Sequence, residues 1–138
     1  RVLLSLEAMA KRWAHLGIRT HIVGEITEPA ITEKDVLIVG SGSGSTLFPA
    51  TIAKKAHDIG AKVIHIGSSP VSPVGEVSSL MVRIPVRTKH YLADEIDSAQ
   101  PMTSLFEQSL LLLGDIVAKM IRRGLDMKAL WRYHANLE

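Results

Sequence analysis

Apolar residues recur every three to four positions in four stretches of the chain, and this spacing predicts amphipathic helices. In the first stretch one face carries five of them: Leu6, Met9, Ala10, Trp13 and Leu16. Gly17 ends this helix, and Gly60 caps the second in the same way. The third helix is the longest and the richest in leucine. The predicted helices cover residues 4–16, 47–59, 102–123 and 126–137.

Short β-branched and apolar runs between these helices predict strands over residues 20–23, 35–39, 62–66 and 80–84. Two of them, 35–39 and 62–66, are almost continuously apolar, which is typical of parallel strands buried on both faces. Strands that alternate with helices at this spacing predict βαβ units and a doubly wound parallel sheet flanked by helices. In such sheets ligands bind at the carboxyl ends of the strands, which directs attention to the loops after Val39 and Ile66.

The composition fits a single globular domain over residues 1–138, with 46% hydrophobic and 22% charged residues. Because there is no cysteine, a thiolate nucleophile and a Cys-type zinc site are excluded. Few aromatic residues and a net charge of +2 argue against a nucleic-acid partner. No uncharged apolar stretch approaches the roughly 20 residues that span a bilayer. We therefore expect a cytoplasmic protein with no membrane contact.

The loop Gly40-Ser-Gly-Ser-Gly-Ser-Thr46 is the strongest chemical signal. Its glycines let backbone amides turn toward an anion, its hydroxyls add donors, and the following helix presents its N-terminus to the same point. The dinucleotide fingerprint lacks its last glycine at Ser45, and no lysine follows as in a nucleotide P-loop. A small phosphorylated metabolite fits best. The alternative is that Ser45 or Thr46 merely caps the helix.

Glu107 stands near the start of the long helix in an apolar stretch. Desolvation at the edge of an apolar cleft would suit a general base. The alternative is a capping box, in which Glu107 reaches back to the amide of Ser104. Both interpretations stay open on the sequence alone.

The six histidines include no pair with metal-ligand spacing, so neither a structural nor a catalytic metal is expected. His15 and His134 lie at or near helix ends, where the helix dipole favours an imidazolium, and this is the structural alternative to a role in a site. The leucine-rich stripe of residues 102–123 is suited to a core and also to burial against another subunit.

Four segments together resemble the sugar isomerase (SIS) domain family and, within it, the 6-phospho-3-hexuloisomerases. They are Ala14-His-Leu-Gly17, the loop at 40–46, Gln100-Pro-Met-Thr-Ser-Leu-Phe-Glu-Gln108 and Arg132-Tyr-His-Ala-Asn-Leu-Glu138. The resemblance implies a flavodoxin-like, three-layer fold without metal or cofactor in a cytoplasmic, commonly tetrameric enzyme. The implied reaction converts D-arabino-3-hexulose 6-phosphate into D-fructose 6-phosphate, in the ribulose monophosphate pathway of formaldehyde fixation.

The resemblance also implies roles for single residues. Glu107 would be the catalytic base, and His15 would enter the active site of a neighbouring subunit and move protons between oxygens. Arg1 would come from the first sugar-binding loop, although Val2 and Leu3 replace the family's Ser and Gly there. Thr103-Ser104 replaces the commoner Gly-Thr. The expected phosphosugar-binding residues are Arg1, Ser41, Gly42, Ser43, Gly44, Ser45, Thr46 and His134.

Two expectations concern the whole protein. Residue 1 is Arg, and a first strand and loop are expected upstream of it. The apolar first and third helices predict a homodimer or homotetramer with those helices at the interface. Two other functions stay open: another aldose–ketose phosphosugar isomerase, such as an arabinose-5-phosphate isomerase, and a sugar-phosphate-sensing domain without catalysis.

Overall fold

A computed structural model describes residues 1–137; Glu138, the last residue of the terminal run quoted above, lies outside the described part. Within that part, three parallel strands form one sheet in the order β1-β2-β3. In the register, Val36 lies beside Lys62, and Ile64 beside Leu80. The strands are β1 (Val36–Gly40), β2 (Lys62–Gly67) and β3 (Leu80–Arg83), which confirms three of the four predicted strands.

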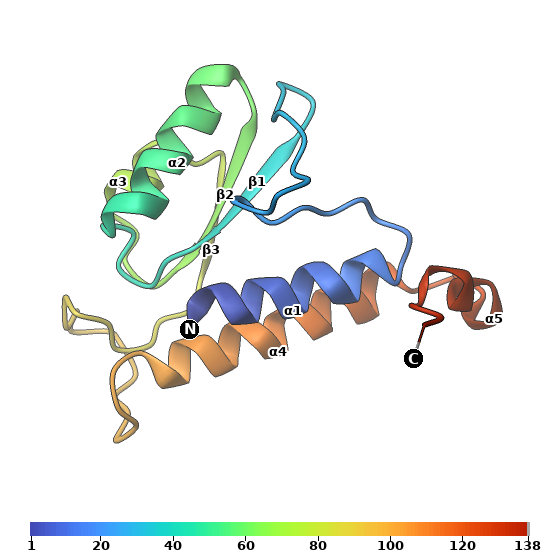
Figure 1. The fold of residues 1–138 in the computed structure, drawn as a ribbon. Helices are drawn as coiled ribbons and strands as arrows, with labels where there is room; N and C mark the ends of the chain where they lie inside the picture. The colour runs from blue at the N-terminus through green and yellow to red at the C-terminus, as the bar shows by residue number, and fades with distance from the viewer. Residues whose placement is uncertain (138) are drawn as a thin grey trace.

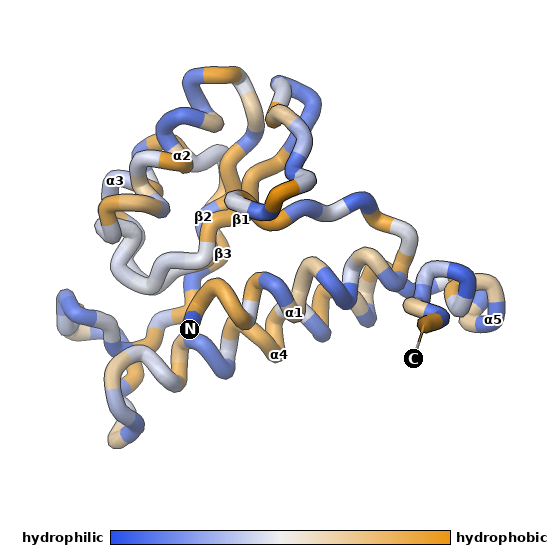
Figure 2. The backbone as a smooth tube through the Cα atoms, viewed as in Figure 1, coloured by the Kyte–Doolittle hydropathy of each residue, from blue (hydrophilic) through white to orange (hydrophobic). Residues whose placement is uncertain are grey.

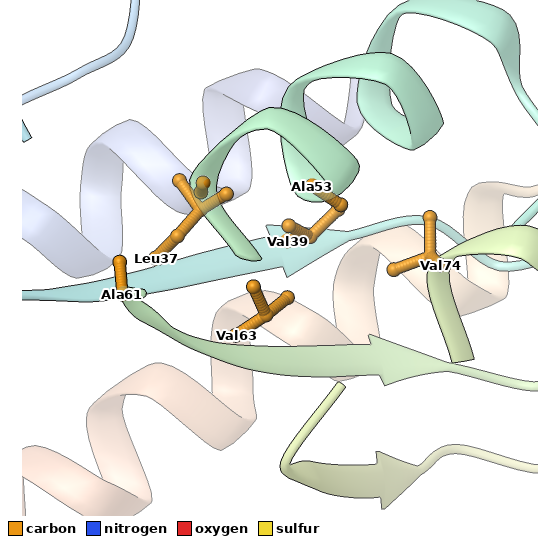
Figure 3. Packing of buried hydrophobic residues seen from close by; sticks show 7 residues of the cluster. Leu37, Val39, Ala53, Ala61, Val63 and Val74 are labelled. Atoms are coloured by element: carbon orange, nitrogen blue, oxygen red, sulfur yellow. The ribbon is translucent and has the colours of Figure 1, made fainter. Parts of the chain in front are cut away.

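Helices α2 (Leu47–Ile59) and α3 (Pro73–Glu76) cover one face of the sheet (Figure 1). Between them and the strands lies a cluster of small and branched apolar side chains, shown in Figure 3: Leu37, Val39, Ala53, Ala56, Ala61, Val63 and Val74. Gly60 ends α2 at a φ of +99°, as its expected capping role requires. Helix α3 was not predicted, although Ser72 before Pro73 is a helix-start signal: the Ser72 hydroxyl accepts from the Gly75 amide at 3.1 Å.

Helices α1 (Val2–Ala14) and α4 (Ser104–Ile121) lie side by side against the other face (Figure 1). They run in the same direction, since Ser5 bonds to the Glu107 carbonyl at one end and Trp13 to the Gly114 carbonyl further along. A Cβ at Gly114 would lie 3.0 Å from the Met9 side chain, so glycine lets the helices approach closely. Hydrophobic residues fill the strands and alternate with polar ones along both helices (Figure 2). The second core cluster comprises Met9, Ile66, Val86, Phe106 and Leu110.

This arrangement is a parallel sheet between two helical layers, and it confirms the predicted fold class. No helix in residues 1–137 is long and apolar enough to cross a membrane.

Two predicted elements are wrong. Residues 20–23 do not pair with the sheet: the Ile22 carbonyl accepts from the Glu25 amide in a turn, and Val23 is half exposed. The stretch 126–137 holds the short helix α5 (Met127–Leu130) and a 3₁₀ turn, η1 (Trp131–Tyr133), instead of one long helix. Because α5 buries none of its side chains, its apolar residues give it no packing energy to extend it.

Candidate active site

The loop at residues 40–46 follows β1 and lies at the carboxyl edge of the sheet, where the sequence predicted it. Backbone hydrogen bonds from the segment after β2 hold it there. The amides of Ser68 and Ser69 donate to the Gly42 carbonyl at 2.8 and 3.1 Å, and the Val74 amide donates to the Gly44 carbonyl at 3.1 Å. The loop is therefore a rigid part of the fold, and no ligand is needed to shape it.

Two glycines allow this close packing. Gly44 has a φ of +63°, and a Cβ there would overlap the Ser72 side chain. At Gly42 a Cβ would meet the Thr88 methyl group at 3.0 Å. A side chain at Gly44 would thus be both strained and sterically excluded.

The hydroxyl groups of the loop bond within it. Ser41 Oγ accepts from the Gly44 amide at 3.1 Å, and Ser43 Oγ accepts from the Ser45 amide at 3.4 Å and the Ser45 hydroxyl at 3.2 Å. Thr46 is the residue that precedes α2, yet its side chain caps no amide. The simple capping interpretation of Ser45 and Thr46 is therefore wrong. The first bond within α2 is Ala50 N–H to Thr46 O, so the preceding helical amides face the loop.

His65, on β2, supports the phosphate loop through a hydrogen bond to its backbone. It is fully buried on β2, and its Nε2 lies 2.9 Å from the Ser41 carbonyl, so Nε2 carries the proton and donates. Burial lowers the pKa of His65 below its usual 6.5, which keeps the ring neutral at pH 7 despite the opposing effect of the Ser41 hydrogen bond. Sequence reasoning assigned His65 no role. The available signal was its place near the carboxyl end of the predicted buried strand 62–66, which neighbours the strand before the phosphate loop.

Glu107 lies at the N-terminal end of α4 and is 8% exposed. Its Oε1 accepts from the Thr103 hydroxyl at 3.2 Å. Its Oε2 lies 3.0 Å from Arg1 Nε but accepts no hydrogen bond of good geometry among the described residues. One oxygen of this carboxylate, Oε2, is therefore buried, lies close to a cation and is open to a further donor.

The capping box predicted as the alternative role of Glu107 is wrong. The helix begins after Thr103, so Ser104 is its first residue and not its cap. The Ser104 amide and hydroxyl both donate to the Pro101 carbonyl, at 3.3 and 2.7 Å. Glu107 bonds to the Thr103 side chain instead of reaching the Ser104 amide.

Neighbouring residues join Glu107 and Arg1 to the phosphate loop. Phe106 is fully buried, and a Cβ on Gly42 would meet its ring at 3.8 Å. Next to Arg1, Val2 would lie 3.0 Å from a Cβ on Gly40. Arg1, Glu107 and the loop therefore belong to one region at the carboxyl edge of the sheet.

His15 and His134 lie elsewhere in the chain. Their rings are close to each other, with centroids 4.6 Å apart, and Trp131 packs against His134 at 5.4 Å. This group is at the far end of α1 from Arg1. Helix α1 has 13 residues and is therefore about 20 Å long. Within one chain, His15 and His134 are remote from Glu107.

A metal site is not apparent within residues 1–137: no group of three or more His, Asp or Glu side chains there could hold an ion. The chemistry of this region consists of a carboxylate, a guanidinium, hydroxyls and backbone amides. Such groups bind a phosphate and transfer protons.

A scan against models of known protein families finds no match. The chain is 39% identical over 137 residues to the 3-hexulose-6-phosphate isomerase of Bacillus subtilis, which covers 98% of this chain and 74% of the relative. It is 38% identical over 140 residues to that of Methylomonas aminofaciens, covering 100% and 76%. A Methanococcus jannaschii protein, whose crystal structure was described as inferring a function of 3-hexulose-6-phosphate isomerase, is 33% identical with a TM-score of 0.82, covering 98% of this chain and 72% of that one.

Proposed function

Because this chain belongs to the family of 3-hexulose-6-phosphate isomerases, we propose that it interconverts D-arabino-3-hexulose 6-phosphate and D-fructose 6-phosphate. The membership confirms the resemblance noted in the sequence. One observation supports the chemistry most directly: Glu107 is a buried carboxylate beside a phosphate-type loop, and one of its oxygens accepts no hydrogen bond from residues 1–137.

The reaction moves a carbonyl group between C2 and C3 of the sugar. From the hexulose side, a base removes the C2 proton, the electrons form an enediolate, and a proton returns to C3. Glu107 can accept the first proton at Oε2 and deliver it to the neighbouring carbon, since one carboxylate can serve both positions. The Thr103 hydroxyl holds the other oxygen and so orients the group.

Arg1 can stabilise the negative charge that develops during this transfer. The Arg1 side chain is 68% exposed, and its Nε lies 3.0 Å from Glu107 Oε2. The remaining donors of the guanidinium are thus available to an enediolate oxygen. This role fits the expected sugar-binding function of Arg1.

The loop would bind the phosphate through its amides, the N-terminus of α2 and the hydroxyls of Ser43, Ser45 and Thr46. Ser41, Gly42 and Gly44 would shape it, given the contacts above. Because these contacts depend on charge, fructose 6-phosphate should bind and fructose should not. Ser43→Asp should abolish binding, since it brings like charges together.

We further propose a cytoplasmic homo-oligomer, a dimer or tetramer, in which His15 and His134 reach the site of a neighbouring subunit. Several apolar side chains on α1 and α4 are exposed and are suited to such an interface: Leu3, Leu4, Leu112, Ile116 and Met120. The separation of about 20 Å between the ends of α1 requires the second chain, if His15 is to act beside Glu107.

Deuterium exchange tests the reaction. Fructose 6-phosphate incubated with the protein in D₂O should gain deuterium at C3, because the enediolate joins C2 and C3. The positions are read by NMR, with arabinose 5-phosphate as a second substrate. Exchange at C1 would assign another aldose–ketose isomerase. Binding with neither deuterium exchange nor formation of a 3-hexulose product would assign a sugar-phosphate-sensing domain.

Mixed oligomers test the shared site. Refolding His15→Ala and Glu107→Gln chains together should restore activity that each variant lacks, because a mixed pair assembles one site with both residues intact. Subunit exchange is verified by mass spectrometry. Exchange without restored turnover would exclude the shared site and leave His15 as a residue favoured by the helix dipole.

A further inference from the structure

Glu95 accepts hydrogen bonds from three residues in two segments of the chain and has no part in the site described above. The Ser68 hydroxyl, after β2, donates to Oε1 at 2.7 Å. Thr88 donates to the same carboxylate twice, from its amide and its hydroxyl, both at 3.1 Å. The Leu92 amide donates at 3.0 Å. Both oxygens are fully engaged, so this carboxylate is suited to positioning the chain and not to proton transfer.

The charge of Glu95 is secured by the same contacts. Burial opposes ionisation, but the hydrogen bonds from Ser68, Thr88 and Leu92 outweigh it and lower the pKa of Glu95 below its usual value. At neutral pH the group is a carboxylate. Four donors directed at one anion fix residues 88–95 relative to the segment after β2.

The segment fixed in this way lies on the phosphate loop. The Thr88 methyl group is the atom that a Cβ on Gly42 would meet at 3.0 Å. Two residues further, the His90 amide donates to the Thr88 hydroxyl oxygen at 3.4 Å. The His90 side chain then reaches Ser45 of the loop, with Nε2 and Oγ 3.1 Å apart.

The direction of that last bond follows from the loop. When the Ser45 hydroxyl donates to Ser43 Oγ, Ser45 Oγ accepts from His90 in the tautomer that carries the proton on Nε2. His90 is exposed and therefore presents an Nε2 donor beside Ser45, at the solvent-facing side of the loop. An anion in the loop would lie within reach of the same donor.

We propose that His90 is a further phosphosugar-binding residue, donating from Nε2 to the phosphate held by the loop, and that Glu95 is the positioning residue that holds it there. The inference rests on the proposed function and deepens it. It adds a side-chain donor from residues 88–95 to a phosphate site otherwise built from β1, α2 and their loop.

Calorimetric binding of fructose 6-phosphate, together with the exchange rate at C3, tests the role of His90. His90→Ala should weaken binding about tenfold or more, while the rate at saturating substrate changes less than about twofold. His90→Gln restores a donor and should recover part of the affinity. The matched control is His57→Ala, an exposed histidine on α2 that lies outside these contacts. If His90→Ala binds as tightly as His57→Ala, the proposal is wrong.

A double-mutant cycle tests Glu95. If Glu95 acts through His90, the double variant Glu95→Ala/His90→Ala should bind about as weakly as Glu95→Ala alone. A merely structural role predicts effects that multiply, and this result would overturn the positioning role. Glu95→Gln keeps the shape and serves if the alanine variant fails to fold. Asp97→Asn, which breaks the exposed pair with Arg87 in the same segment, should leave binding unchanged.

The unmodified protein separates the two levels of the argument. Absence of both binding and C3 exchange with fructose 6-phosphate would overturn the proposed function and this inference together. Normal binding and exchange in the unmodified protein, with no effect of His90→Ala, would overturn the inference alone.

Discussion

Two arginine–carboxylate pairs join α1 to α4 and differ mainly in burial. Arg1 Nε lies 3.0 Å from Glu107 at the start of the helix pair, and Arg12 Nε lies 3.1 Å from Asp115 further along. The Glu107 side chain is 10% exposed and that of Asp115 53%. The Glu107 carboxylate is thus nearly buried and the Asp115 carboxylate is solvated, whereas both arginine side chains are exposed, at 68% and 55%.

The difference shows what burial adds to an ion pair. Water screens the Arg12–Asp115 pair, so it contributes between about 0 and 1 kcal/mol to stability and leaves neither group reactive. Arg12 Nε also donates to Asp115 Oδ1 in a hydrogen bond of good geometry. Glu107 Oε2 has the close cation but no such hydrogen bond. Glu107 therefore keeps a buried oxygen that is open to a further donor, whereas the Asp115 carboxylate is exposed to solvent.

The largest expected effect comes from neutralising each acid. Glu107→Gln keeps the shape and the Thr103 contact but removes the base, so turnover should fall about 100-fold or more. Thermal stability should change little, because the partner Arg1 is largely exposed. Asp115→Asn is the matched control and should keep full activity. Loss of stability with retained turnover in Glu107→Gln would make the two pairs equivalent and favour the sensing domain.

Neutralising each cation gives the next effect. Arg1→Gln should lower kcat/KM about 30-fold, in line with losing a charged hydrogen-bond donor in the transition state. Arg12→Gln should lower it less than about twofold. Steady-state kinetics with fructose 6-phosphate measure both. Equal effects of the two variants would mean that Arg1 acts on the helix pair and not on the substrate.

A smaller effect is expected from the hydroxyl that orients Glu107. Thr103→Val removes the donor to Oε1 while keeping the side-chain shape, and kcat should fall about five- to tenfold. Thr103→Ser should restore most of it. Thr51→Val, which removes an exposed hydroxyl bond within α2, is the control. Unchanged kcat in Thr103→Val would show that burial alone orients the carboxylate.

How well the sequence predicted these regions depends on how local each contact is. The helix at 47–59 was predicted to the residue, because its apolar spacing and Gly60 lie within one segment. The phosphate loop was located correctly for the same reason. Arg1 and Glu107 are 106 positions apart in the chain, so local spacing could not predict their contact. The family resemblance suggested only that each residue belongs to the site.

The errors have the same origin. Ser104 and Glu107 have capping-box spacing, but the Ser104 hydroxyl donates to the Pro101 carbonyl. Thr103 instead of Ser104 then occupies the position before the helix. Residues 20–23 have a strand pattern without a neighbouring strand to pair with. The role of Glu95 was missed, because one of its donors, Ser68, lies 27 positions away and only the folded chain brings it to Glu95.

The smallest expected effect concerns the pH dependence of stability, and it comes from His65 rather than from the two arginine–carboxylate pairs. Because burial lowers the pKa of His65, the unfolded chain binds a proton more readily than the folded one. The stabilisation is complete above the unfolded value of 6.5 and is lost as pH falls toward the lower folded value. The acids with lowered pKa values, such as Glu95, act only near and below 4.5.

Protonation of His65 at Nδ1 would place a positive charge in a fully buried position beside the phosphate loop, although Nε2 could still donate to the Ser41 carbonyl. We therefore expect the phosphate loop to lose stability as the pH falls below 6.5. His65→Gln retains a donor toward the Ser41 carbonyl but cannot titrate. Its unfolding free energy, measured by urea denaturation from pH 7 to 5, should fall less than that of the unmodified protein. Identical slopes in the two proteins would exclude His65 as a source of pH-dependent stability in this range.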